Sequence, residues 1–308
     1  MTRYAGPRSW RRLAVVAALL PVTVVVCDTV MAIAVSLAGG LPYGTLAASA
    51  ATLLFLLFAY AVFSRVVDRV QFAHGGLRPG RLATRHATAG LALGAGLMAA
   101  VVGIQVAVGW ASLALVWRSG VPIMRPDVVD LEFWPAFAGA LVFFGRAALA
   151  EELAFRAVLM GVCLDAAARW DVGPRMRWLI AVVATSMLFG LVHSANPEAG
   201  AGSFLGITLA GVLLGVARMA SGGLWLPWAV HAAWNITEGP IFGFAVSGYE
   251  IRPAIFAVAQ TGPEAWTGGV FGPEAGLLGM LANVAGCAMV WGACVVVNRR
   301  RAAAGTDR

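Results

Sequence analysis

The sequence contains no lysine and few charged residues of any kind. Charged residues make up 12% of the 308 residues, whereas 60% are hydrophobic and the mean hydropathy is +0.82. A soluble domain has about 25% charged residues, so the shortage excludes an ordinary soluble protein and indicates a membrane protein. The formal net charge of +7 depends on arginine alone. We attribute it to cytoplasmic loops rather than to nucleic-acid binding.

Cysteine is also scarce, with four residues in the whole chain. They lie far apart in apolar stretches, with neither the paired spacing of a metal site nor the pattern of a secreted disulfide framework. We interpret them as small core residues: Cys27, Cys163, Cys287 and Cys294.

Long apolar runs are abundant, and a spanning helix needs about 20 such residues. The first run, which follows several arginines, exceeds the 7 to 15 or so residues of a signal-peptide core, so we expect a retained helix. Eight runs predict an all-α membrane protein with about eight transmembrane helices in a single polytopic domain, residues 1–308. The predicted spans are Leu13–Leu37, Leu41–Phe63, Ala87–Trp117, Pro135–Leu164, Trp178–His193, Phe204–Ala220, Leu224–Val246 and Ala275–Val297.

The arginines are distributed unevenly between the two sides that these spans define. Seventeen fall on the side of both termini, and three, Arg118, Arg125 and Arg252, fall on the other. Because basic loops stay in the cytoplasm, we expect a multi-pass protein of the plasma membrane with both termini cytoplasmic. The long loop Ser247–Glu274 would then be external.

Ionisable residues within predicted spans are candidates for a functional site, because they are costly in the bilayer. Two glutamates and an arginine occur together in "AEELAFRAVL", at Glu151, Glu152 and Arg156. Glu152 and Arg156 are four residues apart and can pair on one helix face, whereas Glu151 is rotated by about 100°. We interpret the pair as a support and Glu151 as a general base. The alternative is one buried ionic lock that includes both glutamates.

Two further polar motifs follow on later spans. His193 ends "FGLVH", and His231 and Asn235 share a helix face in "HAAWN", which Glu238 continues one turn further on. Interhelical hydrogen bonding or an ion or proton pathway would also explain such a stripe. If Glu151 and His231 meet, the helical rise places Arg146 and Glu238 at similar depths, which predicts an ion pair.

The ordered set of Glu-Glu-x-x-x-Arg, Phe-x-x-x-His and His-x-x-x-Asn resembles the CAAX protease and bacteriocin-processing (CPBP, or Abi) family of intramembrane proteases. The resemblance covers Pro135 to Phe244, so residues 135–244 are the predicted catalytic region. It implies about eight helices that enclose an intramembrane catalytic cavity. A glycine often follows the family's arginine, whereas Ala157 stands here.

The resemblance also implies hydrolysis of a peptide bond. Glu151 would activate a water molecule with help from His193, and His231 and Asn235 would stabilise the oxyanion. Glu152 and Arg156 would hold Glu151 in place. Zn2+ or another divalent metal could be bound by Glu151, His193 and His231, or the reaction could proceed without metal. The common zinc-protease signature H-E-x-x-H is absent.

One geometric expectation conflicts with this mechanism. Counted from the inner ends of their spans, His193 lies about 22 Å deep and His231 only about 10 to 14 Å deep. Helix tilt, or irregular backbone around a cavity, would be needed to bring them together.

Other functions use similar residues. A proton-coupled transporter needs buried Glu, His and Arg but should show internal repeats, and none is visible. A non-catalytic membrane scaffold or immunity factor would not need the intact motif set. The arginine-only, alanine- and glycine-rich composition indicates a GC-rich bacterium, so we expect a membrane protein or peptide substrate rather than a prenylated one. No nucleic-acid partner is expected.

Overall fold

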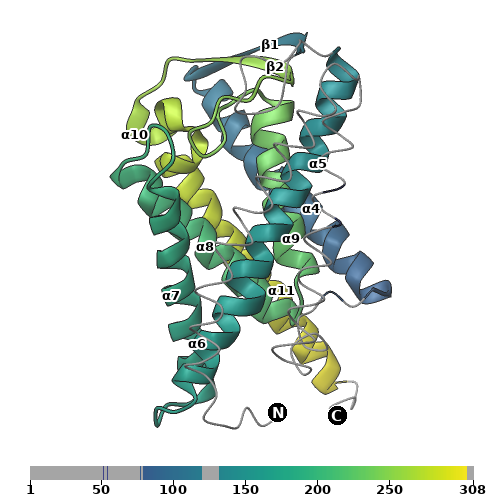
Figure 1. Cartoon of the computed structure of the whole chain (residues 1–308), viewed down its shortest axis with the longest axis vertical. Helices are drawn as coiled ribbons and strands as arrows, with labels where there is room; N and C mark the ends of the chain where they lie inside the picture. The colour runs from purple at the N-terminus through teal and green to yellow at the C-terminus, as the bar shows by residue number, and fades with distance from the viewer. Residues whose placement is uncertain (1–50, 52–53, 55–76, 78, 120–131, 304–308) are drawn as a thin grey trace.

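The structure of the protein is a computed structural model that describes residues 51, 54, 77, 79–119 and 132–303 (Figure 1). The predicted span Leu13–Leu37, and nearly all of Leu41–Phe63, lie outside the described residues. The described part is mostly helical. Its helices are α4 (Arg81–Ala107), α5 (Phe133–Glu152), α6 (Met160–Ala167), α7 (Pro174–His193), α8 (Ala201–Ser221), α9 (Trp225–Ile236), α10 (Glu264–Thr267) and α11 (Leu277–Ala303).

Two π-helical segments and two 3₁₀ turns complete the helical structure. The π-helical segments are η1 (Leu153–Leu159), which joins α5 to α6 without a break, and η2 (Thr237–Ile241), which extends α9. The 3₁₀ turns η3 (Gly269–Phe271) and η4 (Pro273–Ala275) precede α11. Local widening of a helix to π geometry is frequent at functional sites, and η1 begins directly after the two adjacent glutamates.

Four helices in the described residues are long and apolar enough to cross a membrane. They are Arg81–Ala107, Pro174–His193, Ala201–Ser221 and the part of α11 from Leu277 to Val297. The predicted count of eight spans is not confirmed by this set. The predicted span Leu224–Val246 contains only the 12-residue helix α9, followed by η2 and an irregular segment.

The prediction of a helix over Ala87–Trp117, and of an all-α fold, is wrong at one end of the bundle. Helix α4 ends at Ala107, and the chain turns at Gly109, whose φ of 75° favours glycine. Strand β1 (Ala111–Arg118) then pairs in antiparallel register with β2 (Ala254–Gln260). The strand that pairs with β1 lies more than 130 residues further along the chain, so local hydrophobicity could not reveal the pairing.

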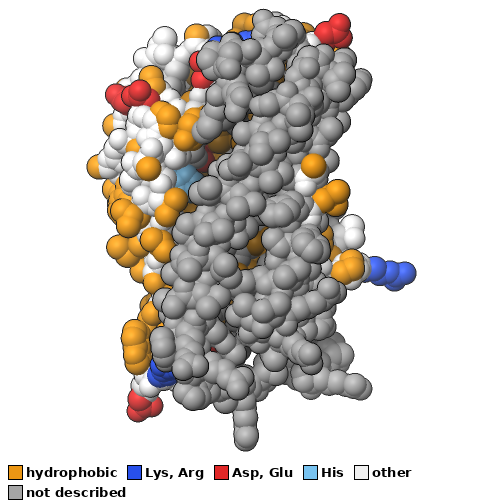
Figure 2. Space-filling model, in the orientation of Figure 1, with side chains coloured by type: hydrophobic (Ala, Val, Ile, Leu, Met, Phe, Trp, Pro, Cys, Tyr) orange, Lys and Arg blue, Asp and Glu red, His pale blue; other side chains and the backbone are white. Residues whose placement is uncertain are grey.

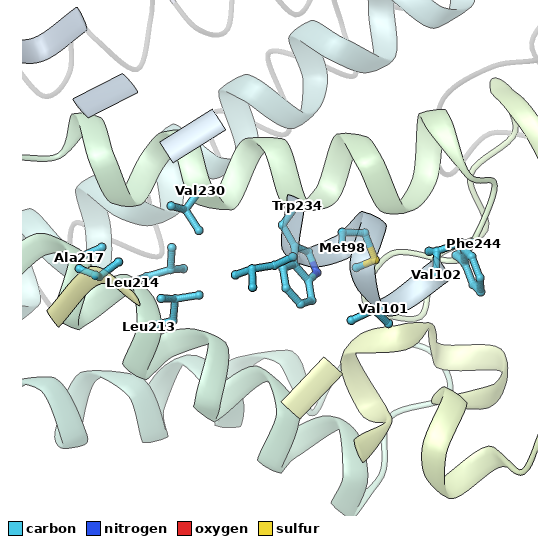
Figure 3. Packing of buried hydrophobic residues seen from close by; sticks show 11 residues of the cluster. Met98, Val101, Val102, Leu213, Leu214, Ala217, Val230, Trp234 and Phe244 are labelled. Atoms are coloured by element: carbon cyan, nitrogen blue, oxygen red, sulfur yellow. The ribbon is translucent and has the colours of Figure 1, made fainter. Parts of the chain in front are cut away.

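A buried apolar core fixes α9 among its neighbours. Trp234 of α9 lies at its centre, with Leu213 and Leu214 of α8 on one side and Met98 and Val102 of α4 on the other (Figure 3). All five side chains are at most 5% exposed. This packing holds the helix that contains His231 and Asn235.

Helix α4 approaches α9 closely because it has glycine at two positions on the shared face. A Cβ atom at Gly90 would lie 2.7 Å from the Leu226 carbonyl oxygen, and one at Gly94 would lie 3.1 Å from the Trp234 backbone nitrogen. Both distances are shorter than ordinary contacts. The spacing Gly-x-x-x-Gly is typical of close helix packing in membranes.

The outer surfaces of the long helices are apolar. Figure 2 shows hydrophobic side chains gathered at the left of the view, where described residues form the surface. On α7, large side chains that are 52 to 60% exposed face outward, among them Leu179, Met187 and Leu191; α11 exposes Leu281, Met289 and Trp291 in the same way. Continuous exposed apolar surface of this kind is expected where lipid is the solvent, so the protein is a membrane protein.

Candidate active site

The buried centre of the site is the carboxylate of Glu152, the last residue of α5. Its Oε1 atom lies 3.2 Å from Nη1 of Arg156 and 3.0 Å from Nδ1 of His231. Glu152 is fully buried, and the Arg156 side chain is 1% exposed. The sequence analysis anticipated the contact with Arg156 but missed the one with His231, which no spacing rule connects.

Arg156 is held by three further groups in the same region. Its Nη2 atom donates a hydrogen bond of 3.3 Å to the carbonyl oxygen of Gly211 on α8. Its guanidinium carbon lies 4.4 Å from the ring centre of Phe189 and 5.7 Å from that of Phe155. Pairing and stacking offset the cost of burying this cation, so Arg156 joins α5, α7 and α8 around Glu152.

Glu151 faces a different direction from its neighbour, and its side chain is 33% exposed. Its Oε2 atom lies 3.8 Å from Nε2 of His193 and 3.7 Å from Nε2 of His231. These separations are too long for direct hydrogen bonds. Oε2 has no hydrogen-bond partner among the described residues. The structure thus brings one carboxylate oxygen and two imidazole nitrogens to a common point.

The other nitrogen of each histidine ring fixes its orientation. Nδ1 of His193 lies 2.8 Å from the Phe189 carbonyl oxygen, which can only accept, so we assign the proton to Nδ1. Nδ1 of His231 likewise donates to the Glu152 carboxylate. In the neutral forms, both Nε2 atoms then present lone pairs toward Glu151.

Asn235 lies one helical turn beyond His231, is buried to the same extent, and lines the same cavity. The cavity has a volume of about 390 Å³, counted with the open space at its mouth. His193, His231, Asn235, Ser247 and Glu274 provide its polar wall. All six predicted site residues are therefore in or next to one region of the bundle.

Glu274 and Ser247 were not anticipated as part of the site. Glu274 belongs to η4, at the end of the segment that we expected to be an external loop. Its Oε2 atom accepts hydrogen bonds from the Ser247 backbone N–H at 2.8 Å and from the Ser247 hydroxyl at 2.7 Å. Burial raises the pKa of Glu274, an effect that Ser247 and the nearby histidines partly oppose. Only the folded loop places it beside the helices.

The predicted ion pair between Arg146 and Glu238 does not form. Neither carboxylate oxygen of Glu238 has a hydrogen-bond partner among the described residues. The Glu238 carboxyl instead faces the Trp234 side chain and the backbone of Glu274. Arg146 stacks on Phe143, with its guanidinium carbon 5.1 Å from the ring centre. Equal depth along two helices did not ensure that the two side chains point toward each other.

The expected difference in depth between His193 and His231 is also absent. Both imidazoles lie within 4 Å of the same Glu151 oxygen. The depth estimate assumed that the helix of His231 crosses the whole membrane from Leu224. Because α9 has only 12 residues, its first residue need not lie at the membrane surface.

The described residues do not form a preassembled metal site. Among them, no group of three or more His, Cys, Asp or Glu side chains is arranged to hold a metal ion. The two separations from Glu151 to the histidines also exceed the roughly 3.3 Å expected between ligands of a tetrahedral zinc ion. As placed here, Glu151, His193 and His231 are therefore not at the separations of tetrahedral zinc ligands.

Comparison with known proteins identifies the region that contains these residues. Residues 133–237 match the family model described as "Type II CAAX prenyl endopeptidase Rce1-like". Neither the curated proteins nor the solved structures gave a match. The matched region begins at α5 and ends just after Asn235, so it includes all six predicted site residues. The match of residues 133–237 to this protease family is consistent with the CPBP resemblance of the sequence motifs.

Proposed function

We propose that the protein is an intramembrane endopeptidase in which Glu151 activates the water molecule that attacks a peptide bond. The observation that supports this proposal is the convergence of Glu151 Oε2 with two imidazole Nε2 atoms at 3.7 and 3.8 Å. Polar atoms separated by such distances can be bridged by one water molecule. A water molecule held there would contact a carboxylate able to accept its proton.

The reaction needs only groups of the chain and one water molecule. The water oxygen attacks the substrate carbonyl carbon while its proton passes to Glu151, and His193 Nε2 accepts a hydrogen bond from the same water. The carbonyl oxygen becomes an oxyanion. When the C–N bond breaks, the proton on Glu151 passes to the leaving amine, which restores the carboxylate.

Asn235 and His231 are the proposed donors to the oxyanion. The Asn235 side-chain amide has two N–H donors and lines the cavity. His231 already uses its Nδ1 proton for Glu152, so it can donate from Nε2 only as an imidazolium. Glu152 and Glu151 both lie beside this ring and would stabilise that cation. Arg156 acts through Glu152 and is a positioning residue.

The proposed substrate is a peptide or protein of the bacterial plasma membrane. A catalytic group buried among lipid-facing helices can reach only substrates that enter the membrane or its surface. The composition argument against prenylated proteins still applies. Cleavage assays should therefore compare a transmembrane peptide with a CAAX-type peptide in farnesylated and unmodified forms.

The test compares purified wild type with Glu151→Gln in detergent. Glu132→Gln is the matched control, because this exposed glutamate begins the same helix, about 28 Å away. We expect Glu151→Gln to lower kcat by at least about 100-fold, the usual contribution of a general base, with Glu132→Gln unchanged. Equal cleavage by wild type and Glu151→Gln would contradict the role of Glu151.

A chelator arm tests the requirement for metal in the same assay. The geometry of the three candidate ligands predicts that EDTA or phenanthroline leaves cleavage unchanged. Inhibition that added Zn2+ reverses would show that Glu151, His193 and His231 rearrange to bind metal. Failure of wild type to cleave any of the three peptides would favour a non-catalytic scaffold.

A further inference from the structure

The cavity beside the histidines extends to a buried amide on α11. This helix mainly faces outward, with only 17% of its spanning window buried. Asn283 is an exception, because it is 2% exposed and lines the cavity. An otherwise lipid-facing helix therefore directs one polar side chain into the bundle.

The nitrogen of the Asn283 amide lacks a partner in the described part of the chain. This atom, Nδ2, is buried and has no hydrogen bond there. An unpaired buried amide is unfavourable, since it loses its hydrogen bonds with water without replacement. Such a group at the wall of a cavity points to a bound polar group that completes its hydrogen bonding.

Apart from its polar groups, the cavity is lined by apolar side chains. They include Ile207, Leu213, Leu214 and Val230. The volume of about 390 Å³ includes the open space at the mouth of the cavity, so the cavity can be reached from outside. His193, His231 and Asn235 border the same space, so a side chain next to the scissile bond would enter it.

We propose that this cavity is a specificity pocket for one substrate side chain, and that Asn283 selects an uncharged side chain with an apolar stem and a polar tip, such as glutamine. The inference rests on the proposed protease function. Leucine would fill the apolar walls but leave the Asn283 amide unpaired. Sites built to hydrogen-bond a substrate discriminate strongly against analogues that lack the polar group. Glu274 at the polar wall disfavours an acidic side chain.

The test uses pairs of membrane peptides that differ only by glutamine or leucine at one position flanking the scissile bond. For wild type, we expect kcat/KM to favour glutamine by at least about 10-fold at one position. Asn283→Leu should remove or reverse this preference, because the pocket becomes apolar throughout. Val284→Ala is the matched control, since Val284 is the next residue on α11, is 53% exposed, and should keep the wild-type preference.

Asn283→Ala provides a second variant in case the leucine does not fit. It should also lose the glutamine preference, while still cleaving the leucine peptide. If wild type cleaves both peptides equally at every position, or if both Asn283 variants keep its preference, the pocket proposal is overturned while the protease proposal stands. Failure of wild type to cleave any peptide would instead overturn the proposed function itself.

Discussion

At the scale of single residues, Glu152 connects two sequence motifs that are 79 residues apart. One of its oxygens faces both the Arg156 guanidinium and the His231 imidazole. The charge of Arg156 compensates the buried carboxylate, and the carboxylate orients the ring. A substitution of Arg156 should therefore alter the orientation of the His231 ring through Glu152, without any direct contact between Arg156 and His231.

Arg156→Met tests this dependence. The variant retains a long apolar side chain but leaves the buried Glu152 carboxylate without its cation. Removal of one partner of a buried ion pair typically costs about 3–5 kcal/mol. We expect a destabilisation of this size in denaturant unfolding of the detergent-solubilised protein, together with reduced cleavage.

The double variant Glu152→Gln/Arg156→Met should regain much of the lost stability, because no uncompensated charge stays buried. It should not regain activity, since His231 loses its carboxylate partner. Arg175→Met, at an exposed position, is the control and should unfold like wild type. Equal stability of the single and double variants would show that the buried Glu152 carboxylate is not stabilised by the charge of Arg156.

The sequence predicted most of the site at this scale because helical spacing determines which neighbours share a face. The Glu152–Arg156 contact and the different direction of Glu151 are of this local kind. The sequence did not indicate Glu274, Ser247 or Asn283, which reach the cavity from a folded loop and from another helix. It also suggested an Arg146–Glu238 contact that depends on rotation between helices, which spacing does not determine.

At the scale of elements, the close packing of α4 and α9 positions two of the proposed catalytic groups. Gly94 of α4 faces the backbone of Val230 and Trp234, on either side of His231 in the sequence. A side chain at Gly94 would push α9 away from α4. Since His231 must stay near Glu151, the site should be sensitive to this distant contact.

Gly94→Ala and Gly103→Ala form a matched pair on the same helix. A Cβ at Gly94 would lie 3.0 Å from the Val230 carbonyl carbon, whereas one at Gly103 would meet no atom within 4 Å. We expect Gly94→Ala to destabilise the protein by about 1–3 kcal/mol, as overpacking does, and to lower kcat. Gly103→Ala should change neither. Thermal unfolding and cleavage rates measure both effects, and wild-type behaviour of Gly94→Ala would refute the packing argument.

Periodicity and hydropathy predicted the helical elements but not how they end. The residues of β1 are apolar enough to extend α4, and only pairing with β2 makes a strand favourable. The pairing partner lies beyond five further helices in the sequence. The sequence also could not distinguish the short α9 from a full span, because the apolar residues that follow α9 continue its hydrophobic pattern.

At the scale of the whole molecule, several described arginines lie at opposite ends of the bundle. Arg118 donates hydrogen bonds to the carbonyl oxygens of Ile251 and Arg252, at the end formed by the β1–β2 sheet (Figure 1). The α6–α7 turn, with Arg169 and Arg175, and the final turn of α11 lie at the other end. The end of the bundle that has more arginines should face the cytoplasm.

Cysteine labelling in intact cells tests this orientation. In a variant with all four native cysteines replaced by alanine, Ala265→Cys on α10 should react with a membrane-impermeant maleimide. Arg175→Cys, at the opposite end, should react only after the cells are permeabilised. Both positions are exposed, so access to the reagent depends on the side of the membrane. The reverse pattern would show that the sheet faces the cytoplasm.

The π-helical segment η1 sets the angular phase between two halves of one long helix. Helix α5 packs against α9, and α6 packs against α7, where Met160 meets Ala181 and Val182. A π turn takes up more residues than the 3.6 of an α-helix, so η1 adjusts the direction in which α6 points relative to α5. Deletion of one residue from Leu153–Leu159 should restore regular winding and leave the direction of α6 nearly unchanged, because the π segment takes up about one extra residue. The same deletion within the regular part of α5 would instead rotate everything that follows by about 100°, so that α6 would lose its packing against α7.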